Sequence, residues 1–146
     1  MLRGSSVAKV DDRGRLKVPA GFRRFIEDRY GRGMFVTSLD GASVRIYPQT
    51  VWQEIEQKLA ALPTMTPARQ KFLNAVNFWG QMTTMDGQGR ILIQPELRKA
   101  AEVQSDVRII GQQTYLDVWN EERFAAKIAS EPLTSEDFDV LGKLGI

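Results

Sequence analysis

The sequence predicts an α+β fold, mainly β, in which two copies of one small module interlock into a single core with flanking helices. Three observations predict it. A short motif with β-prone flanks occurs twice, 75 positions apart. An amphipathic helical segment follows each motif, and a second pair of β-prone segments follows each helix. Each copy spans about 45 residues, too few to bury a stable core alone, so we expect one shared pseudo-twofold core.

The repeated motif has the form D-x-x-G-R, followed by β-prone residues and a proline. It reads DDRGRLKVP at 11–19 and DGQGRILIQP at 86–95. Glycine takes positive φ at low cost and the leading aspartate can hydrogen-bond the turn backbone, so each copy predicts a tight hairpin. The following helices carry Phe22, Arg23, Phe25 and Ile26 in the first copy, and Leu97, Arg98, Ala100 and Ala101 in the second.

Each copy continues with a second hairpin and a closing helix. Segments 34–37 and 44–47 flank a turn at Asp40-Gly41, and segments 107–110 and 115–119 flank a turn within 111–114. Apolar residues then recur at helical spacing. They are Val51, Trp52, Ile55, Leu59 and Leu62 after the first copy, and Phe124 and Ile128 after the second.

The repeat divides the chain into four parts. These are a first module at 5–51, a helical linker at 52–79, a second module at 80–126 and a C-terminal tail at 127–146. In the linker, Thr66 and Pro67 suit the N-cap and first position of a helix. In the tail, Ser135 can cap a helix that carries Phe138 and Leu141. The sequence leaves open whether this tail is a docked helix or a loose end.

The composition excludes several kinds of site. The chain has no cysteine and no histidine, which removes thiol nucleophiles, serine–histidine triads, disulfides and the usual zinc and iron sites. We therefore expect no catalytic residues, no metal and no cofactor, and a protein that is not an enzyme. No apolar run is long enough for a signal peptide or a membrane span, so we expect a cytoplasmic protein with no membrane partner.

Charge is distributed unevenly, although the net charge is only +2. Residues 1–35 carry nine basic and four acidic groups, residues 36–120 carry eight of each, and residues 121–146 carry three basic and six acidic groups. A basic N-terminal part with an acidic end is compatible with binding to a polyanion, but it also serves solubility.

Basic residues gather around the first motif. Strand alternation puts Leu16 and Val18 on an apolar inner face, with Arg15 and Lys17 on a basic outer face. A two-stranded ribbon of this kind fits a major groove, and clustered cations suit phosphate contacts. The candidate DNA-binding residues are Arg3, Lys9, Arg13, Arg15, Lys17 and Arg90.

The other motif residues have a structural interpretation. Each aspartate can pair with the arginine four positions later and stiffen its turn. The expected structural residues are Asp11, Gly14, Asp86 and Gly89. The second motif has Thr84, Gln88 and Leu92 at the positions of Lys9, Arg13 and Lys17. We therefore expect the first module to dominate DNA affinity and the second turn to be mainly structural.

These motifs resemble the MraZ family. The likeness runs from residue 2 to about 130 and rests on LRG at 2–4, VDDRGRLKVP at 10–19, YP at 47–48 before Trp52, EIEQKL at 54–59 and MDGQGRILI at 85–93. One D-x-x-G-R is a weak signal. Two copies at this spacing, with the segments between them, are highly specific.

The resemblance implies more than the composition does. It implies two tandem SpoVT/AbrB-like modules joined as a swapped-hairpin, double-ψ-like β-barrel, and assembly of chains into rings. It also implies a nucleoid-associated transcriptional regulator that represses its own division and cell-wall gene cluster by binding short, repeated G-rich promoter elements in double-stranded DNA. The family's D-x-x-x-R pattern falls on Asp11 and Arg15, and on Asp86 and Arg90, with the arginines as the expected DNA contacts.

Two other functions compete with DNA binding. The basic surface can instead bind a protein, for instance the ribosomal RNA methyltransferase encoded beside the family's genes. An enzyme is the other competitor, but the sequence has no converging carboxylates and no phosphate-binding loop. A sealed, deep pocket would reopen that possibility.

Overall fold

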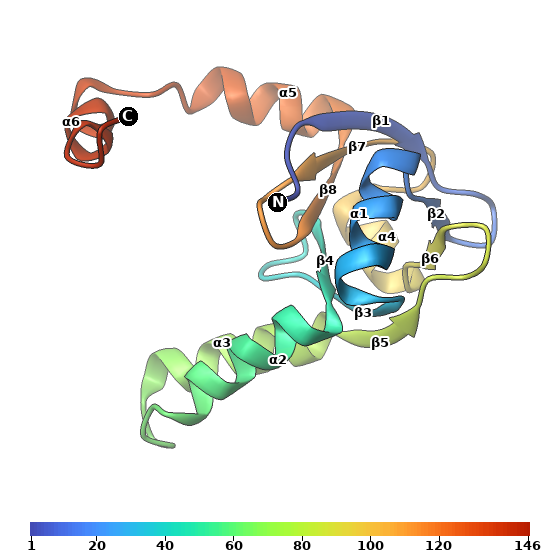
Figure 1. Ribbon diagram of the computed structural model, residues 1–146, viewed down its shortest axis with the longest axis horizontal. Helices are drawn as coiled ribbons and strands as arrows, with labels where there is room; N and C mark the ends of the chain where they lie inside the picture. Colours follow the sequence, from blue (N-terminus) through green and yellow to red (C-terminus); the bar gives the residue numbers. More distant parts are fainter.

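The computed structural model describes residues 1–146 as a mixed α+β fold (Figure 1). The strands are β1 (Ser5–Lys9), β2 (Arg15–Lys17), β3 (Gly33–Thr37), β4 (Val44–Pro48), β5 (Gln81–Thr84), β6 (Arg90–Leu92), β7 (Asp106–Gly111) and β8 (Leu116–Asn120). The helices are α1 (Ala20–Tyr30), α2 (Gln49–Ala60), α3 (Pro67–Trp79), α4 (Pro95–Ala101), α5 (Glu121–Ser130) and α6 (Ser135–Gly142). None of these helices combines the length and apolar character needed to cross a bilayer.

Four of the six strand pairs join the two halves of the chain. The large sheet has the order β1-β7-β8-β4-β3-β5, and a two-stranded sheet joins β2 to β6, all antiparallel. Strands β1 to β4 of the first half correspond to β5 to β8 of the second. When each strand is replaced by its counterpart, the β1–β7 pair becomes β5–β3, and the β2–β6 and β4–β8 pairs stay the same. The large sheet is open, with β1 and β5 at its edges, so the expectation of a closed barrel is wrong for this sheet.

The first hairpin of each copy also differs from the prediction. Val10 and Leu16 form a single bridge next to the turn, and beyond it β1 leaves to pair with β7 while β2 pairs with β6. Pairing with the other copy puts β1 into the six-stranded sheet and lets β2 and β6 contribute to the shared core. The second hairpins, β3–β4 and β7–β8, are confirmed.

One main core serves both halves of the chain. Leu16 and Ile26 from the first half, and Ile91 and Leu97 from the second, belong to the same buried cluster and are at most 1% exposed. Burial of apolar surface stabilises a fold by about 25 cal/mol per Å² and is its main source of stability. Neither half encloses this cluster alone. The prediction of one shared core is confirmed.

The linker forms a helical pair that extends from the sheet (Figure 1). A second apolar cluster joins Trp52 of α2 to Phe35 and Tyr47 of the sheet and to Val76 of α3. The helix α3 begins at Pro67 as predicted, but the Thr66 side chain makes no capping hydrogen bond.

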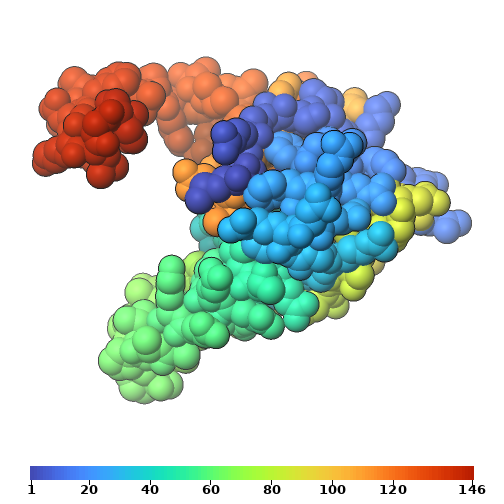
Figure 2. Space-filling model, viewed as in Figure 1, coloured from blue at the N-terminus to red at the C-terminus, as the bar shows by residue number.

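The C-terminal tail is helical but not docked. The helix α5 anchors its first turn to the sheet, where both Arg108 Nε and Nη2 donate to the Glu121 carboxylate at 2.8 Å. Beyond it, α6 is capped by Thr134 rather than by Ser135 and is separated from the β core (Figures 1 and 2).

Candidate nucleic-acid interface

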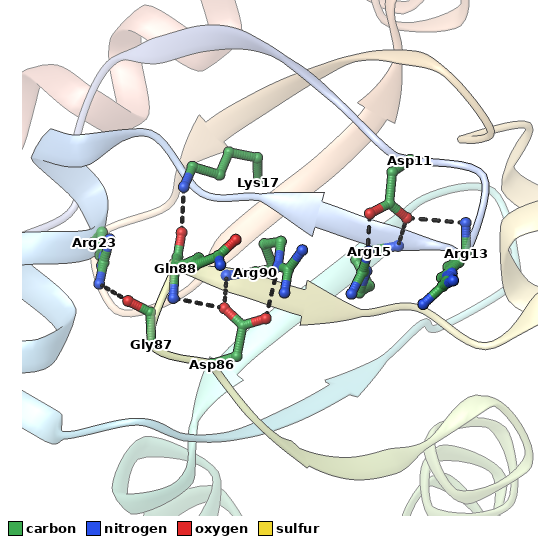
Figure 3. Close-up of polar contacts among 9 residues, drawn as sticks. All are labelled: Asp11, Arg13, Arg15, Lys17, Arg23, Asp86, Gly87, Gln88 and Arg90. Carbon is green, nitrogen blue, oxygen red and sulfur yellow. Dashed lines mark hydrogen bonds and ion pairs between the residues drawn. The ribbon is translucent and has the colours of Figure 1, made fainter.

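The first motif is a turn held by one aspartate. Asp11 Oδ1 accepts from the backbone nitrogens of Arg13 and Arg15 at 3.0 and 2.9 Å, and Oδ2 accepts from Arg15 Nε at 2.8 Å (Figure 3). The Gly14 nitrogen donates to the Asp11 carbonyl at 3.0 Å. A carboxylate that accepts three hydrogen bonds, one from a guanidinium, fixes both the turn and the arginine.

The second motif repeats this geometry. Asp86 Oδ1 accepts from the backbone nitrogens of Gln88 and Arg90 at 2.9 Å each, and Oδ2 accepts from Arg90 Nε at 2.7 Å. The backbone N–H of Arg90, with help from its guanidinium, lowers the pKa of the Asp86 carboxyl to about 2. The backbone N–H of Arg15 likewise lowers the pKa of Asp11. Both carboxylates are therefore ionised at neutral pH and pair with their arginines.

Both turns need glycine for two reasons. Gly14 has a φ of +81° and Gly89 a φ of +75°, a region that side chains with a Cβ rarely adopt. A Cβ on Gly14 would also lie 2.5 Å from Arg98 Cζ, and one on Gly89 would lie 2.7 Å from Arg23 Cδ. Each turn is thus packed against an arginine from the other half of the chain.

The two motifs build one ribbon. Strand β2 pairs with β6 in the register Arg15 with Leu92, Leu16 with Ile91, and Lys17 with Arg90. The ribbon extends into both turns, because the Val18 nitrogen donates to the Gly89 carbonyl and the Ile93 nitrogen donates to the Gly14 carbonyl, each at 2.9 Å.

Alternation along the ribbon separates its two faces. Leu16 and Val18 are at most 1% exposed, which confirms the predicted apolar inner face, and Ile91, opposite Leu16, is fully buried as well. Arg15, Lys17 and Arg90 share the outer face.

Two contacts tie the halves together at the second turn (Figure 3). Lys17 Nζ donates to the Gln88 carbonyl, and Arg23 Nη2 donates to the Gly87 carbonyl at 2.8 Å. At the other turn, Arg98 Nε donates to the Ile93 carbonyl at 2.8 Å. Arg23 and Arg98 were not predicted from the sequence as residues of the site. The repeat contains a signal for them, because Arg23 and Arg98 are 75 positions apart, the same spacing as that of the two motifs.

The arginines of the ribbon keep donors free. Each of Arg15 and Arg90 uses Nε for its aspartate, and their terminal Nη atoms donate to no protein acceptor. Their side chains are 29% and 27% exposed. A guanidinium held at Nε with its two Nη groups free matches the acceptors of a guanine edge or a phosphate.

The remaining candidates lie at the first turn and along β1. Arg13 is exposed at the first turn, and Lys9 lies 3.9 Å from Asp106 with its side chain 82% exposed. Arg3 precedes β1 while Lys9 ends it, and six residues of extended chain span about 20 Å. Arg3 therefore lies at the far end of β1 from the first turn, and its contact with DNA stays a prediction.

The fold and site define an α+β protein whose two repeats jointly present a basic β-ribbon. A family model with the description "MraZ protein, putative antitoxin-like" matches residues 1–75 and 80–140. A transcriptional regulator MraZ of Acidobacterium capsulatum is 47% identical over 146 residues, and one of Koribacter versatilis is 48% identical over 147 residues, with both chains fully covered in each case. One of Thiobacillus denitrificans is 33% identical over 129 residues, covering 88% of this chain and 87% of the relative. This chain belongs to the MraZ family.

Proposed function

We propose that this chain is a sequence-specific, DNA-binding transcriptional regulator that contacts duplex DNA through the outer face of the β2–β6 ribbon. One observation carries the proposal: Arg15 and Arg90, from opposite halves, lie on one face of one ribbon with free Nη donors. The relatives named transcriptional regulators support the same function. Regulation of this kind needs no catalytic residue, metal or cofactor.

The two modules contribute unequally to DNA recognition. A two-stranded ribbon fits the major groove, where arginine donors pair with guanine O6 and N7. Lys9, Arg13 and Lys17 come from the first module, so that module makes more phosphate contacts and dominates affinity, although Lys17 lies opposite Arg90 and next to the second turn. The second module contributes fewer contacts because Thr84, Gln88 and Leu92 stand at the positions of those cations.

Higher affinity comes from several chains acting together. One ribbon of three residues per strand makes few contacts and binds weakly. A ring of chains places several ribbons along repeated G-rich promoter elements, which raises the effective concentration at each element. In this proposal each chain is a swapped-hairpin pair of SpoVT/AbrB-like modules, at 5–51 and 80–126. The assembly is nucleoid-associated and represses the division and cell-wall gene cluster that includes its own gene.

Fluorescence anisotropy tests the function. Duplex DNA from upstream of this protein's gene is compared with the same DNA in which the repeats are scrambled, over a series of salt concentrations. Preference for intact repeats, with affinity falling steeply as salt rises, supports a sequence-specific regulator. Equal binding to both duplexes would reduce the ribbon to a non-specific basic surface.

A protein-binding role is the second candidate. The α2–α3 pair extends from the sheet and exposes Leu62 and Met65 between its helices, as protein-binding surfaces do. The proposed partner is the ribosomal RNA methyltransferase encoded beside the family's genes. Capture of that enzyme by wild-type protein and equally by Arg15→Ala would favour this role over DNA binding.

A further inference from the structure

The C-terminal arm, residues 131–146, contains a helix with nothing packed beside it. A capping box begins α6: Thr134 Oγ1 accepts from the Asp137 nitrogen at 3.2 Å, and Asp137 Oδ2 accepts from the Thr134 nitrogen at 2.8 Å. Every residue of the arm except Leu141 is exposed. The exposed apolar side chains are Leu133, Phe138, Val140, Leu144 and Ile146, each at least 57% accessible.

Such an arm needs a partner. The helix α6 has eight residues, and isolated helices of fewer than about 12 residues are marginal in water. Its capping box makes the helix locally encoded, while its apolar residues gain nothing from exposure to solvent. A contiguous apolar surface on a projecting element is typical of an interaction site.

An apolar groove on the same chain has the matching chemistry. The N-terminal groove, about 420 Å³, lies between the chain start and α1 and is lined by Met1, Leu2, Arg3, Ser6, Pro19, Gly21, Phe22 and Phe25. Arg3 has the one charged side chain of its lining, whereas the arm carries four acidic residues and one lysine. Apolar character and charge therefore favour the arm as its occupant.

The internal repeat contains a similar arrangement. A second groove, about 390 Å³, lies at the equivalent position in the other half and includes Gln81, Gln94, Glu96 and Leu97, each 75 positions after a residue of the N-terminal groove. The end of α3 supplies Phe78 and Trp79 to its wall. Phe78 and Trp79 lie 75 positions after Arg3 and Gly4, so the end of α3 lines this groove where the chain start lines the first, and only the N-terminal groove lacks a helix there.

We infer that the arm of one chain docks in the N-terminal groove of a second copy, with Phe138 and Leu141 against Phe22 and Phe25 and the acidic side chains near Arg3. The geometry favours another chain, because α5 is ten residues long, about 15 Å, and directs the arm away from its own core (Figures 1 and 2). This inference deepens the proposed assembly of several chains and does not depend on DNA binding.

Engineered cysteines test where the arm docks, because the chain has no cysteine of its own. Two single variants, Ser6→Cys in the groove and Val140→Cys in the arm, carry tags of different mass and are mixed under oxidising conditions. A mixed disulfide between the two chains is expected. Replacing the groove variant by Gln57→Cys, exposed on α2, is the control and should give little mixed product. If the double variant Ser6→Cys/Val140→Cys forms only a disulfide within one chain, the arm docks on its own core and the inference is wrong.

Charge exchange provides the second test, read by analytical ultracentrifugation of the full chain. Arg3→Glu and Asp139→Lys should each weaken association about tenfold, and the double variant should recover most of the loss. Glu56→Lys, the same change at an exposed site of α2, should have no effect. Wild-type protein that stays monomeric would overturn the proposed assembly together with the inference. If Arg3→Glu, Asp139→Lys and the double variant all associate as tightly as wild type, only the docking of the arm is wrong.

Discussion

Replacing Gly14 by alanine tests whether the turns are braced by the other half of the chain. The backbone at Gly14 has a φ of +81°, and an L-residue in this region loses about 1–2 kcal/mol. The new Cβ would also lie 2.5 Å from the Arg98 guanidinium. Arg98 must then move and give up its hydrogen bond to the Ile93 carbonyl, which is worth about 1–2 kcal/mol. We expect Gly14→Ala to lower the free energy of unfolding by about 2–4 kcal/mol.

Two further variants separate the backbone effect from the contact with Arg98. Gly4→Ala provides the backbone control, because Gly4 has a φ of +80° and open space around it, so it should cost only about 1–2 kcal/mol. In an Arg98→Ala background, Gly14→Ala should fall to that same cost. Urea denaturation of wild type, Gly14→Ala, Arg98→Ala and the double variant gives the coupling energy. Equal costs of Gly14→Ala with and without Arg98 would refute the bracing.

Other variants test the ribbon and its aspartates. Arg15→Ala should lower affinity for promoter duplex about 10- to 100-fold while circular dichroism and ultracentrifugation stay unchanged, and Arg90→Ala should lose less; equal losses would contradict the dominance of the first turn. Lys17→Ala should weaken intact and scrambled duplexes alike and reduce the slope of log affinity against log salt by about one, whereas a loss confined to intact repeats would make it a base contact. The Asp86 pKa is lowered to about 2 from an ordinary value of about 3.9, so its stabilising effect is complete above that ordinary value and is lost as pH falls toward 2. Urea denaturation at a series of pH values should therefore show a smaller decline below pH 4 for Asp86→Asn than for wild type, and identical declines would remove Asp86 from the acid response.

The local elements were predictable because the sequence encodes them within a few residues. The D-x-x-G-R turns arise from an aspartate, a glycine with positive φ and an arginine four positions after the aspartate, all inside one motif. The second hairpins follow from alternating β-prone segments around Gly-containing turns. The linker helix begins at Pro67, where proline fixes φ and lacks an N–H to satisfy.

The pairing of the two halves was not predictable to the same degree. A D-x-x-G-R turn with β-prone flanks is equally compatible with a local hairpin and with strands that diverge to another copy. Only the common burial of Leu16 and Ile91 distinguishes them, and burial depends on the whole fold. For the same reason the sequence did not predict the roles of Arg23 and Arg98, because each contacts a turn more than 60 positions away.

The ribbon explains why the chain carries both motifs although their charges differ. Strands β2 and β6 have three residues each and form a two-stranded sheet of their own, and an isolated two-stranded ribbon of that length is unstable in water. Its inner face is buried in the shared core, and its second turn is held by Arg23 from the first half. The second motif must therefore preserve Asp86, Gly89 and Arg90 to shape the face on which Arg15 lies, even where its other cations are absent. An outer surface contributed mainly by one copy thus depends on the geometry of both.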